Sequence, residues 1–366
     1  MAQTAIPYMQ LRGGSSKGLY FKFSDLPADP ATREAVLLAA VGGADPRQID
    51  GLGGADPLTS KVGIVGPSSR EDADLDYLFV QVVVGEGRID TTPNCGNILA
   101  GVGAFAIESG LMPATTAETT ITVHMVNSGK LCELKFNTPD GEVLYEGDVC
   151  IDGVPGTSAP IVCNYLDVAG SACGSLLPTG NAVDTVDGIE MTCIDNGMPV
   201  VVMRAADLGI SGYESPEQLN ENAELKAKLQ SIRLQIGPKM NLGDVDGAAV
   251  PKMCMIAPAR QGGLISTRTF IPYKCHSAIG VLGAVSVATA CILPDSVAEK
   301  LVSVPAGAIK QLSVEHPSGS FEVNLEIDES SPELSVEKAG VLRTARLLSR
   351  GEVFVANSVW SGEKDL

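Results

Sequence analysis

Two similar segments, beginning at Cys95 and at Cys275, constrain the fold of this chain more than any other feature. Each starts with a cysteine, continues as a largely apolar run, and has a proline 18 or 19 positions after the cysteine. A helix that is apolar on every side is buried. The repeat therefore predicts two buried helices, one in each half of a 366-residue chain, whose length is typical of two domains.

Runs of alternating polar and apolar residues surround each of these segments. After each segment in the sequence, two such runs flank a turn that contains Ser-Gly, and this pattern predicts a β-hairpin. The paired runs are 120–126 with 131–136, and 309–314 with 321–327. Further strand-like runs precede the segments, at 61–65, 77–84, 199–204 and 253–257. We expect an α+β protein whose two pseudo-symmetric domains are each an antiparallel sheet rolled around a central buried helix.

The boundary between the two halves is expected near Asp184, after a stretch rich in Gly, Ala and Pro. Residues 1–184 would form the first half, and residues 185–344 the second. The C-terminal segment 345–366 contains a last alternating run, which we expect to return and complete the first half. The polar segment 214–235 predicts a surface helix.

The formal net charge of −18 narrows the possible partners. Nucleic acids and anionic membranes bind basic surfaces, so neither is expected. A small anion needs only a few local cations and backbone N–H groups, and it stays possible. The apolar run 277–293 is short for a membrane span and predicts a core helix. Residues 1–14 lack the pattern of a signal peptide, so we expect a cytoplasmic protein.

The nine cysteines form no CxxC pair, and only three histidines accompany them. Zinc sites need closer spacing of such ligands. We therefore expect reduced thiols that mostly pack in the core, with neither a metal ion nor a cofactor.

The first candidate site is Asn94-Cys95-Gly96-Asn97, a polar stretch beside an apolar helix. Backbone N–H groups at a helix start stabilise a thiolate and also bind carboxylates. All four residues are therefore candidates for substrate contact, with Cys95 as the reactive group. The simpler alternative is a small cysteine that packs at a helix start.

Cys275-His276-Ser277 holds the matching position in the second half. If it heads the second helix, its N–H groups and side chains would bind a second part of an anionic ligand. Whether Cys275 takes part in chemistry stays open, and a lone histidine is often a core residue.

The third candidate is Lys61, which follows Ser60 at the end of a glycine-rich loop and opens an apolar strand. A lysine that loses its surrounding water gives up its proton more easily, as a general base requires. Local composition alone favours a different interpretation, in which Lys61 lies at a strand edge with its amine in water.

Two turns complete the set of candidates. The first, Arg12 to Gly18, contains the cations Arg12 and Lys17 and the hydroxyls of Ser15 and Ser16. These groups would bind an anion. The alternative is a solvated turn without a ligand. Its spacing is not that of a P-loop. The second contains Thr179 and Gly180 and could serve either the site or the fold.

In order and spacing, these motifs resemble the PrpF family, and the resemblance covers almost the whole chain. The family includes 2-methylaconitate, methylitaconate and 4-oxalomesaconate isomerases. Gln48 to Gly51 and Cys275-His276 resemble the 4-oxalomesaconate tautomerases of gallate and protocatechuate breakdown. The resemblance implies the diaminopimelate-epimerase fold, with the site between the two halves. It also implies that Lys61 and Cys95 transfer the proton without a cofactor.

The expected function is therefore an allylic proton shift or a keto–enol tautomerisation on a small unsaturated tricarboxylate. Three alternatives stay open: an isomerase of 2-methylaconitate or methylitaconate, a racemase that uses Cys95 and Cys275, and a binding protein for polycarboxylates. Cys275-His276-Ser277 differs from the Cys-Gly-Ser/Thr of two-cysteine epimerases, which disfavours the racemase. A homodimer is one option for the assembly.

Overall fold

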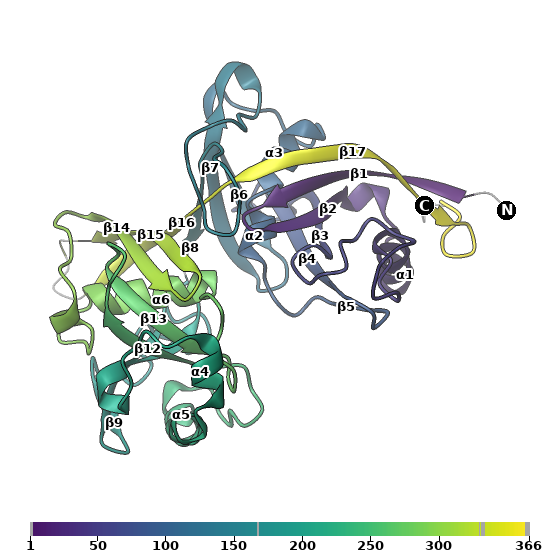
Figure 1. Cartoon of the computed structure of the whole chain (residues 1–366). Helices are drawn as coiled ribbons and strands as arrows, with labels where there is room; N and C mark the ends of the chain where they lie inside the picture. Colours follow the sequence, from purple (N-terminus) through teal and green to yellow (C-terminus); the bar gives the residue numbers. More distant parts are fainter. Residues whose placement is uncertain (1–2, 167, 329, 331–333, 363–366) are drawn as a thin grey trace. The chain divides into compact units, whose positions relative to one another are not determined.

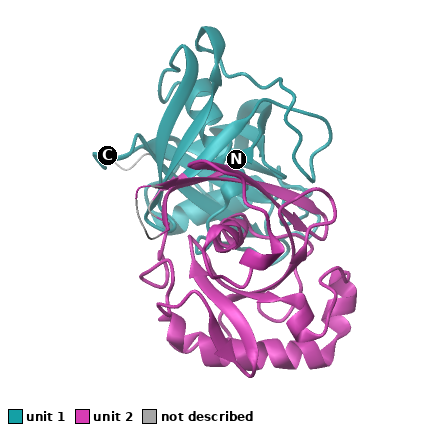
Figure 2. Ribbon diagram, turned by 90° about the vertical axis from the view of Figure 1, so that its left-hand side faces the viewer, with its two compact units in different colours: residues 1–164, 342–366 teal, residues 165–341 magenta. Residues whose placement is uncertain are grey.

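The computed structural model describes residues 3–166, 168–328, 330 and 334–362. The chain divides into two compact units, each treated separately below (Figure 2). Unit 1 comprises residues 1–164 and 342–366, and unit 2 comprises residues 165–341. Unit 1 is therefore built from two segments of the chain, while unit 2 is a continuous segment.

The sheet of unit 1 has the order β17-β1-β2-β3-β4-β6-β7, with β5 also paired to β4 (Figure 1). Its pairings are antiparallel except β2–β3 and β4–β6. The strands are β1 (Gln3–Gly13), β2 (Ser16–Lys22), β3 (Lys61–Pro67), β4 (Leu75–Val83), β5 (Arg88–Asp90), β6 (Ala117–Met125), β7 (Lys130–Thr138) and β17 (Ala345–Ala356), and β8 (Ile161–Leu166) runs to the boundary. The helices are α1 (Pro30–Val41), α2 (Gly96–Leu99) and α3 (Val102–Glu108), with 3₁₀ turns at Phe23–Asp25 and Pro139–Gly141.

The predicted buried helix of unit 1 is present, but it is divided into α2 and α3. Tyr20, from β2, donates a hydrogen bond of 2.6 Å to the carbonyl oxygen of Ile98. At Gly101 a Cβ atom would overlap the Tyr20 hydroxyl, so only glycine fits there. Ala100 and Gly101 keep right-handed helical φ and ψ, so the division is a local change of hydrogen bonding where the Tyr20 hydroxyl binds Ile98.

Unit 2 repeats the same pattern of pairings in the order β9-β10-β11-β12-β13-β14-β15-β16. Here β11–β12 and β13–β14 are parallel. The strands are β9 (Asp184–Val186), β10 (Ile189–Asp195), β11 (Pro199–Arg204), β12 (Lys252–Pro258), β13 (Ile265–Phe270), β14 (Ile309–His316), β15 (Gly319–Asp328) and β16 (Ser335–Arg343). The helices are α4 (Pro216–Glu221), α5 (Ala223–Ile236) and α6 (Val281–Ile292), with 3₁₀ turns at Ala205–Leu208, Pro238–Met240 and Glu299–Leu301.

Two predicted helices differ from the structure in their extent. The apolar segment of unit 2 forms α6, which is buried along most of its length but begins at Val281, six residues after Cys275. The predicted surface helix 214–235 is two helices, α4 and α5, which meet at Asn222. The Asn222 side chain accepts a 3.0 Å hydrogen bond from the Leu225 N–H and so starts the second helix. Within the described residues, none of the helices has the length and apolarity that crossing a membrane requires.

The chain passes from unit 1 to unit 2 after Asn164, twenty residues before the expected boundary at Asp184. The intervening segment packs with unit 2, because the Asp195 carboxylate accepts hydrogen bonds from the N–H groups of Ala172 and Cys173 at 2.7 and 2.8 Å. At the other end, β17 returns to unit 1 and pairs with β1 from Gln3–Ala356 to Gly13–Ala345.

Candidate active site

Lys61 is a buried lysine, with 8% of its surface exposed, so the solvated strand-edge interpretation is wrong. Its Nζ atom donates a 2.6 Å hydrogen bond to Oε1 of Gln81, the residue opposite it on β4. Nζ also lies 5.1 Å from the centre of the Phe79 ring. An ammonium group over an aromatic ring is stabilised by the negative face of the ring.

Gln81 holds the lysine amine in one position. Its Nε2 group donates to the carbonyl oxygens of Pro57, Ser60 and Val82, each at 3.1 Å. Three acceptors fix the nitrogen side of the amide, so its oxygen must face Lys61. The register of β3 with β4 therefore creates a defined acceptor for this lysine.

Cys95 is half-buried and occupies the N-cap position of α2. Its thiol makes no hydrogen bond with any residue that the structure describes. Its carbonyl oxygen accepts from the Tyr77 hydroxyl at 3.3 Å and from the Leu99 N–H at 2.9 Å. Cys95 therefore lies at the start of a helix, as the sequence predicts, although this helix has only four residues.

Lys61 and Cys95 both contact side chains on one face of β4. Tyr77, Phe79 and Gln81 alternate along this strand and so point to the same side. Phe79 and Gln81 contact the lysine, and Tyr77 contacts Cys95. A buried amine and an accessible thiol thus share one side of the sheet, without a direct hydrogen bond between them.

The turn between β1 and β2 lies against the start of α2. Asn97 Nδ2 donates to the hydroxyls of Ser15 and Ser16 at 3.1 and 3.4 Å. A Cβ atom at Gly13 or Gly14 would overlap Asn97, and Gly14 has a φ of +50°. The two glycines therefore let both serines approach the residues that follow Cys95.

Arg12 and Lys17, from the same motif, face away from this site. Gly18 pairs with Lys61 and points toward Ile98 of α2, so Lys17 lies on the opposite face of the sheet. Arg12 on β1 lies directly opposite Lys17 on β2, so its side chain points to the same face of the sheet as that of Lys17. The structure thus brings Ser15 and Ser16 to the α2 side, but it does not bring the two cations together with Lys61.

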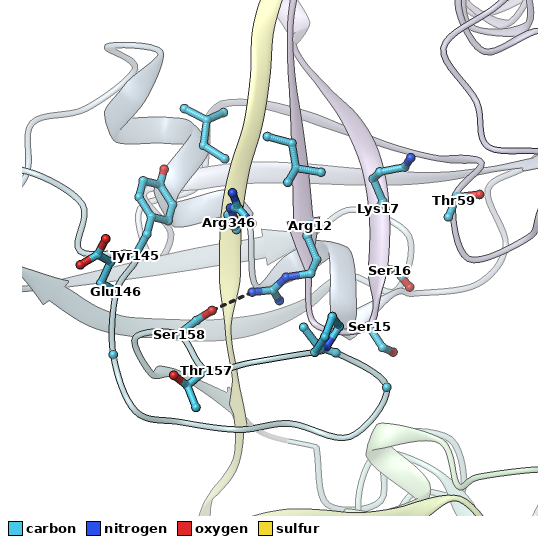
Figure 3. A pocket seen from close by; sticks show the side chains of 16 residues that line it. Arg12, Ser15, Ser16, Lys17, Thr59, Tyr145, Glu146, Thr157, Ser158 and Arg346 are labelled. Atoms are coloured by element: carbon cyan, nitrogen blue, oxygen red, sulfur yellow. Dashed lines mark hydrogen bonds between the residues drawn. The ribbon is translucent and has the colours of Figure 1, made fainter.

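The Arg12 guanidinium is bound by other parts of unit 1 (Figure 3). Its Nη1 atom donates to Gly14 O, Thr344 O and Thr344 Oγ1, each at 3.0 Å, and its Nη2 atom donates to Ser158 Oγ at 3.1 Å. Burial lowers the pKa of Arg12, and the charge of Arg346 lowers it further.

Ser60 and Asn94 have different surroundings. The buried Ser60 hydroxyl donates a 2.7 Å hydrogen bond to Gln48 Oε1, which also accepts from the Ala55 N–H at 2.8 Å. Ser60 therefore fastens the glycine-rich loop that precedes Lys61. Asn94 is exposed, and Gly96 is the first residue of α2.

In unit 2, the expected helix start at Cys275 is wrong. Cys275 forms a bridge with Phe270, and residues 275–280 precede α6. Because the thiol lies outside a helix N-terminus, burial dominates and raises its pKa to about 11. Cys275 is therefore a neutral thiol at pH 7.

His276 and Ser277 continue this extended segment. His276 Nδ1 accepts a 2.8 Å hydrogen bond from the Ala278 N–H. Burial lowers the pKa of His276, as does the charge of Lys252. The imidazole is therefore neutral at pH 7 with its proton on Nε2, while Ser277 is exposed.

The turn that contains Thr179 and Gly180 also belongs to unit 2. Thr179 Oγ1 donates to Asp184 Oδ2 at 2.6 Å, which ties the turn to the start of β9. Gly180 has a φ of +77°, a conformation that favours glycine. Both residues thus have a structural role in unit 2.

All nine cysteines are free. The described residues contain no group of three or more His, Cys, Asp or Glu side chains that could hold a metal ion.

These two pseudo-symmetric, mostly antiparallel sheets and their central helices define an α+β isomerase of the diaminopimelate-epimerase-like fold. The chain belongs to the PrpF family, whose model, described as PrpF protein, matches residues 3–356. It is 54% identical to a 4-oxalomesaconate tautomerase of Pseudomonas putida, over 99% of both chains. It is 56% identical to a (4E)-oxalomesaconate Delta-isomerase of a Novosphingobium species, over 95% of this chain and 97% of the relative.

Solved structures show the same fold. The crystal structure of methylitaconate-delta-isomerase superposes with a TM-score of 0.89 at 33% identity, over 98% of this chain and 97% of that one. A hydroxyproline epimerase from Agrobacterium vitis has a TM-score of 0.51 at 12% identity, over 98% and 95% of the two chains, and shows the likeness of fold alone.

Proposed function

We propose that this isomerase is a 4-oxalomesaconate tautomerase, which moves a proton on this unsaturated keto tricarboxylate without a cofactor. The proposal rests on the positions of two groups: the buried Lys61 amine and the half-buried Cys95 both contact residues on one face of β4. The substrate is proposed from the names of the two relatives at 54% and 56% identity. We further propose that the enzyme acts in the cytoplasm, in the breakdown of aromatic compounds.

The reaction begins at a C–H bond next to a carbonyl group or a conjugated alkene. Lys61, in its neutral form, takes the proton from this carbon, and the electron pair of the C–H bond moves into the conjugated system as an enolate. Cys95 then gives its proton to the oxygen or to the far carbon of that system. A return of the Lys61 proton to the thiolate, through the product or solvent, restores both groups.

The residues around Cys95 are suited to hold the carboxylates of such an acid. The hydroxyls of Ser15 and Ser16 and the amide of Asn97 lie together, and the N–H of Gly96 opens α2. Donors that are already in place stabilise developing negative charge without reorganising during the reaction. A contribution to binding from His276, Ser277 or Thr179 stays a prediction.

Replacing Lys61 by alanine tests the proposal. General acid–base catalysis contributes roughly 10²–10⁴-fold to a rate, and Lys61→Ala should lose about that much turnover on 4-oxalomesaconate. Proton NMR in D₂O would follow both the tautomerisation and the exchange of the transferred hydrogen. Lys22→Ala serves as control, because the Lys22 amine contacts Ser109 in unit 1 instead of the Gln81 site. Near-full activity of Lys61→Ala would remove the lysine from the mechanism.

The same assay separates the alternatives. The methylitaconate isomerase alternative is supported by one relative, the 3-methylitaconate isomerase of Eubacterium barkeri, at 36% identity. Such an enzyme would turn over methylitaconate faster than the other acids tested. A two-thiol racemase would lose its turnover in the Cys275→Ser variant, whereas the proposed enzyme keeps its turnover. A binding protein would incorporate no deuterium into any of the acids.

A further inference from the structure

Three cations stand side by side on the face of the unit 1 sheet that is turned away from Lys61. Arg12 pairs directly with Lys17 on β2 and with Arg346 on β17. Residues that are directly opposite on neighbouring strands present their side chains to the same face. Lys17, Arg12 and Arg346 therefore form one row across three adjacent strands, here called the cation row.

The cation row lines a cavity of about 760 Å³ that lies entirely within unit 1 (Figure 3). The segment 145–158 forms the other wall and includes Thr157, Ser158 and Tyr145, whose hydroxyl donates to Glu108 Oε1 at 3.3 Å. Glu146 is the acidic residue of the lining, and it is exposed. The site is therefore rich in hydrogen-bond donors and carries a positive charge.

No carboxylate neutralises this row among the residues that the structure describes. Lys17 and Arg346 make no ion pair or side-chain hydrogen bond there, and Arg12 donates only to carbonyl and hydroxyl oxygens. Like charges directly opposite each other destabilise a sheet. A bound anion would relieve this repulsion directly, whereas the diffuse net charge of −18 offsets it only in part because distant charges are screened.

We propose that the cation row is a second anion site, which binds a small polycarboxylate on the face of the sheet opposite the Lys61 site. Neighbouring strands lie about 4.8 Å apart, so the outer two cations start from points about 10 Å apart. A molecule with two or three separated carboxylates matches this spacing better than a single phosphate group does. The cation row itself contains no residue of the proposed active site, although Ser15 and Ser16, at the turn between β1 and β2, line the cavity and also contact Asn97 beside Cys95.

Binding of citrate, measured by isothermal titration calorimetry, tests this site. A hydrogen bond to a charged group contributes enough that Arg346→Gln should weaken citrate binding about tenfold or more. Arg346→Glu should abolish the part of citrate binding that Lys61→Ala keeps. The control Arg47→Gln removes an arginine that lies in an exposed turn of unit 1, and it should bind citrate as the wild type does. Inorganic phosphate should bind more weakly than citrate.

Lys61→Ala distinguishes the two sites. It should keep citrate binding at the cation row, and Arg346→Gln should keep the turnover of the wild type. The melting temperature of Arg346→Gln without citrate should equal or exceed that of the wild type, which confirms folding and reports the relief of repulsion. The proposal is overturned if Arg346→Glu binds citrate normally, if Lys61→Ala loses all binding, if phosphate binds as tightly as citrate, or if Arg346→Gln loses turnover.

Discussion

At the scale of single residues, the site depends on Gln81 as much as on the two residues that the sequence singled out. Lys61 and Cys95 are visible as motifs, since a lysine follows a glycine-rich loop and a cysteine precedes an apolar helix. Gln81 belongs to no motif, because its role follows from the register of β3 with β4 and from three carbonyl groups that fix its amide. Local sequence does not contain that register, so it does not predict the role of Gln81, and local composition alone favours a solvated Lys61 over the desolvated lysine that a general base requires.

Replacing Gln81 by methionine keeps the size of the side chain and removes the acceptor of Lys61. We expect turnover to fall roughly tenfold because the amine is less well positioned.

Gln311→Met is the matched control, because Gln311 is an exposed strand residue of unit 2. It should leave the turnover unchanged. A Gln81→Met enzyme with the turnover of the wild type would show that Gln81 does not act through Lys61.

At the scale of elements, the repeat predicted both central helices but not where each begins or breaks. The first helix is interrupted because Tyr20, some eighty positions earlier in the chain, inserts its hydroxyl at Gly101. The second begins at Val281 because the preceding Cys275 is held in a bridge with Phe270. Both departures come from contacts between distant segments, which local patterns do not contain.

The interruption between α2 and α3 can be tested with Gly101→Ala. The new methyl group would overlap the Tyr20 hydroxyl, and overpacking of this kind typically costs about 1–3 kcal/mol of unfolding free energy. In a Tyr20→Phe background the nearest overlapping atom is gone and only ring Cζ, at 2.8 Å, still overlaps, so the same substitution should cost less. Urea unfolding of the four proteins of this double-mutant cycle gives the coupling. Equal costs in both backgrounds would mean that another contact fixes the break.

At the scale of the whole molecule, charge is the dominant property. A net charge of −18 opposes the compact state through self-repulsion, and dissolved salt screens that repulsion. The urea midpoint should therefore rise when NaCl increases from 20 to 500 mM. Sucrose at matched osmolality controls for general solvent effects. A midpoint that stays constant or falls with salt would show that local ion pairs outweigh the net charge.

The pairing of β17 with β1 has a consequence for the order in which the protein folds during its synthesis. Unit 2 is continuous in sequence, so all its strands leave the ribosome together. The first strand of unit 1 must wait for residues 345–356, which are made on the order of tens of seconds later. We expect the middle of the chain to complete its sheet first, while β1 keeps one open edge until residues 345–356 have been made.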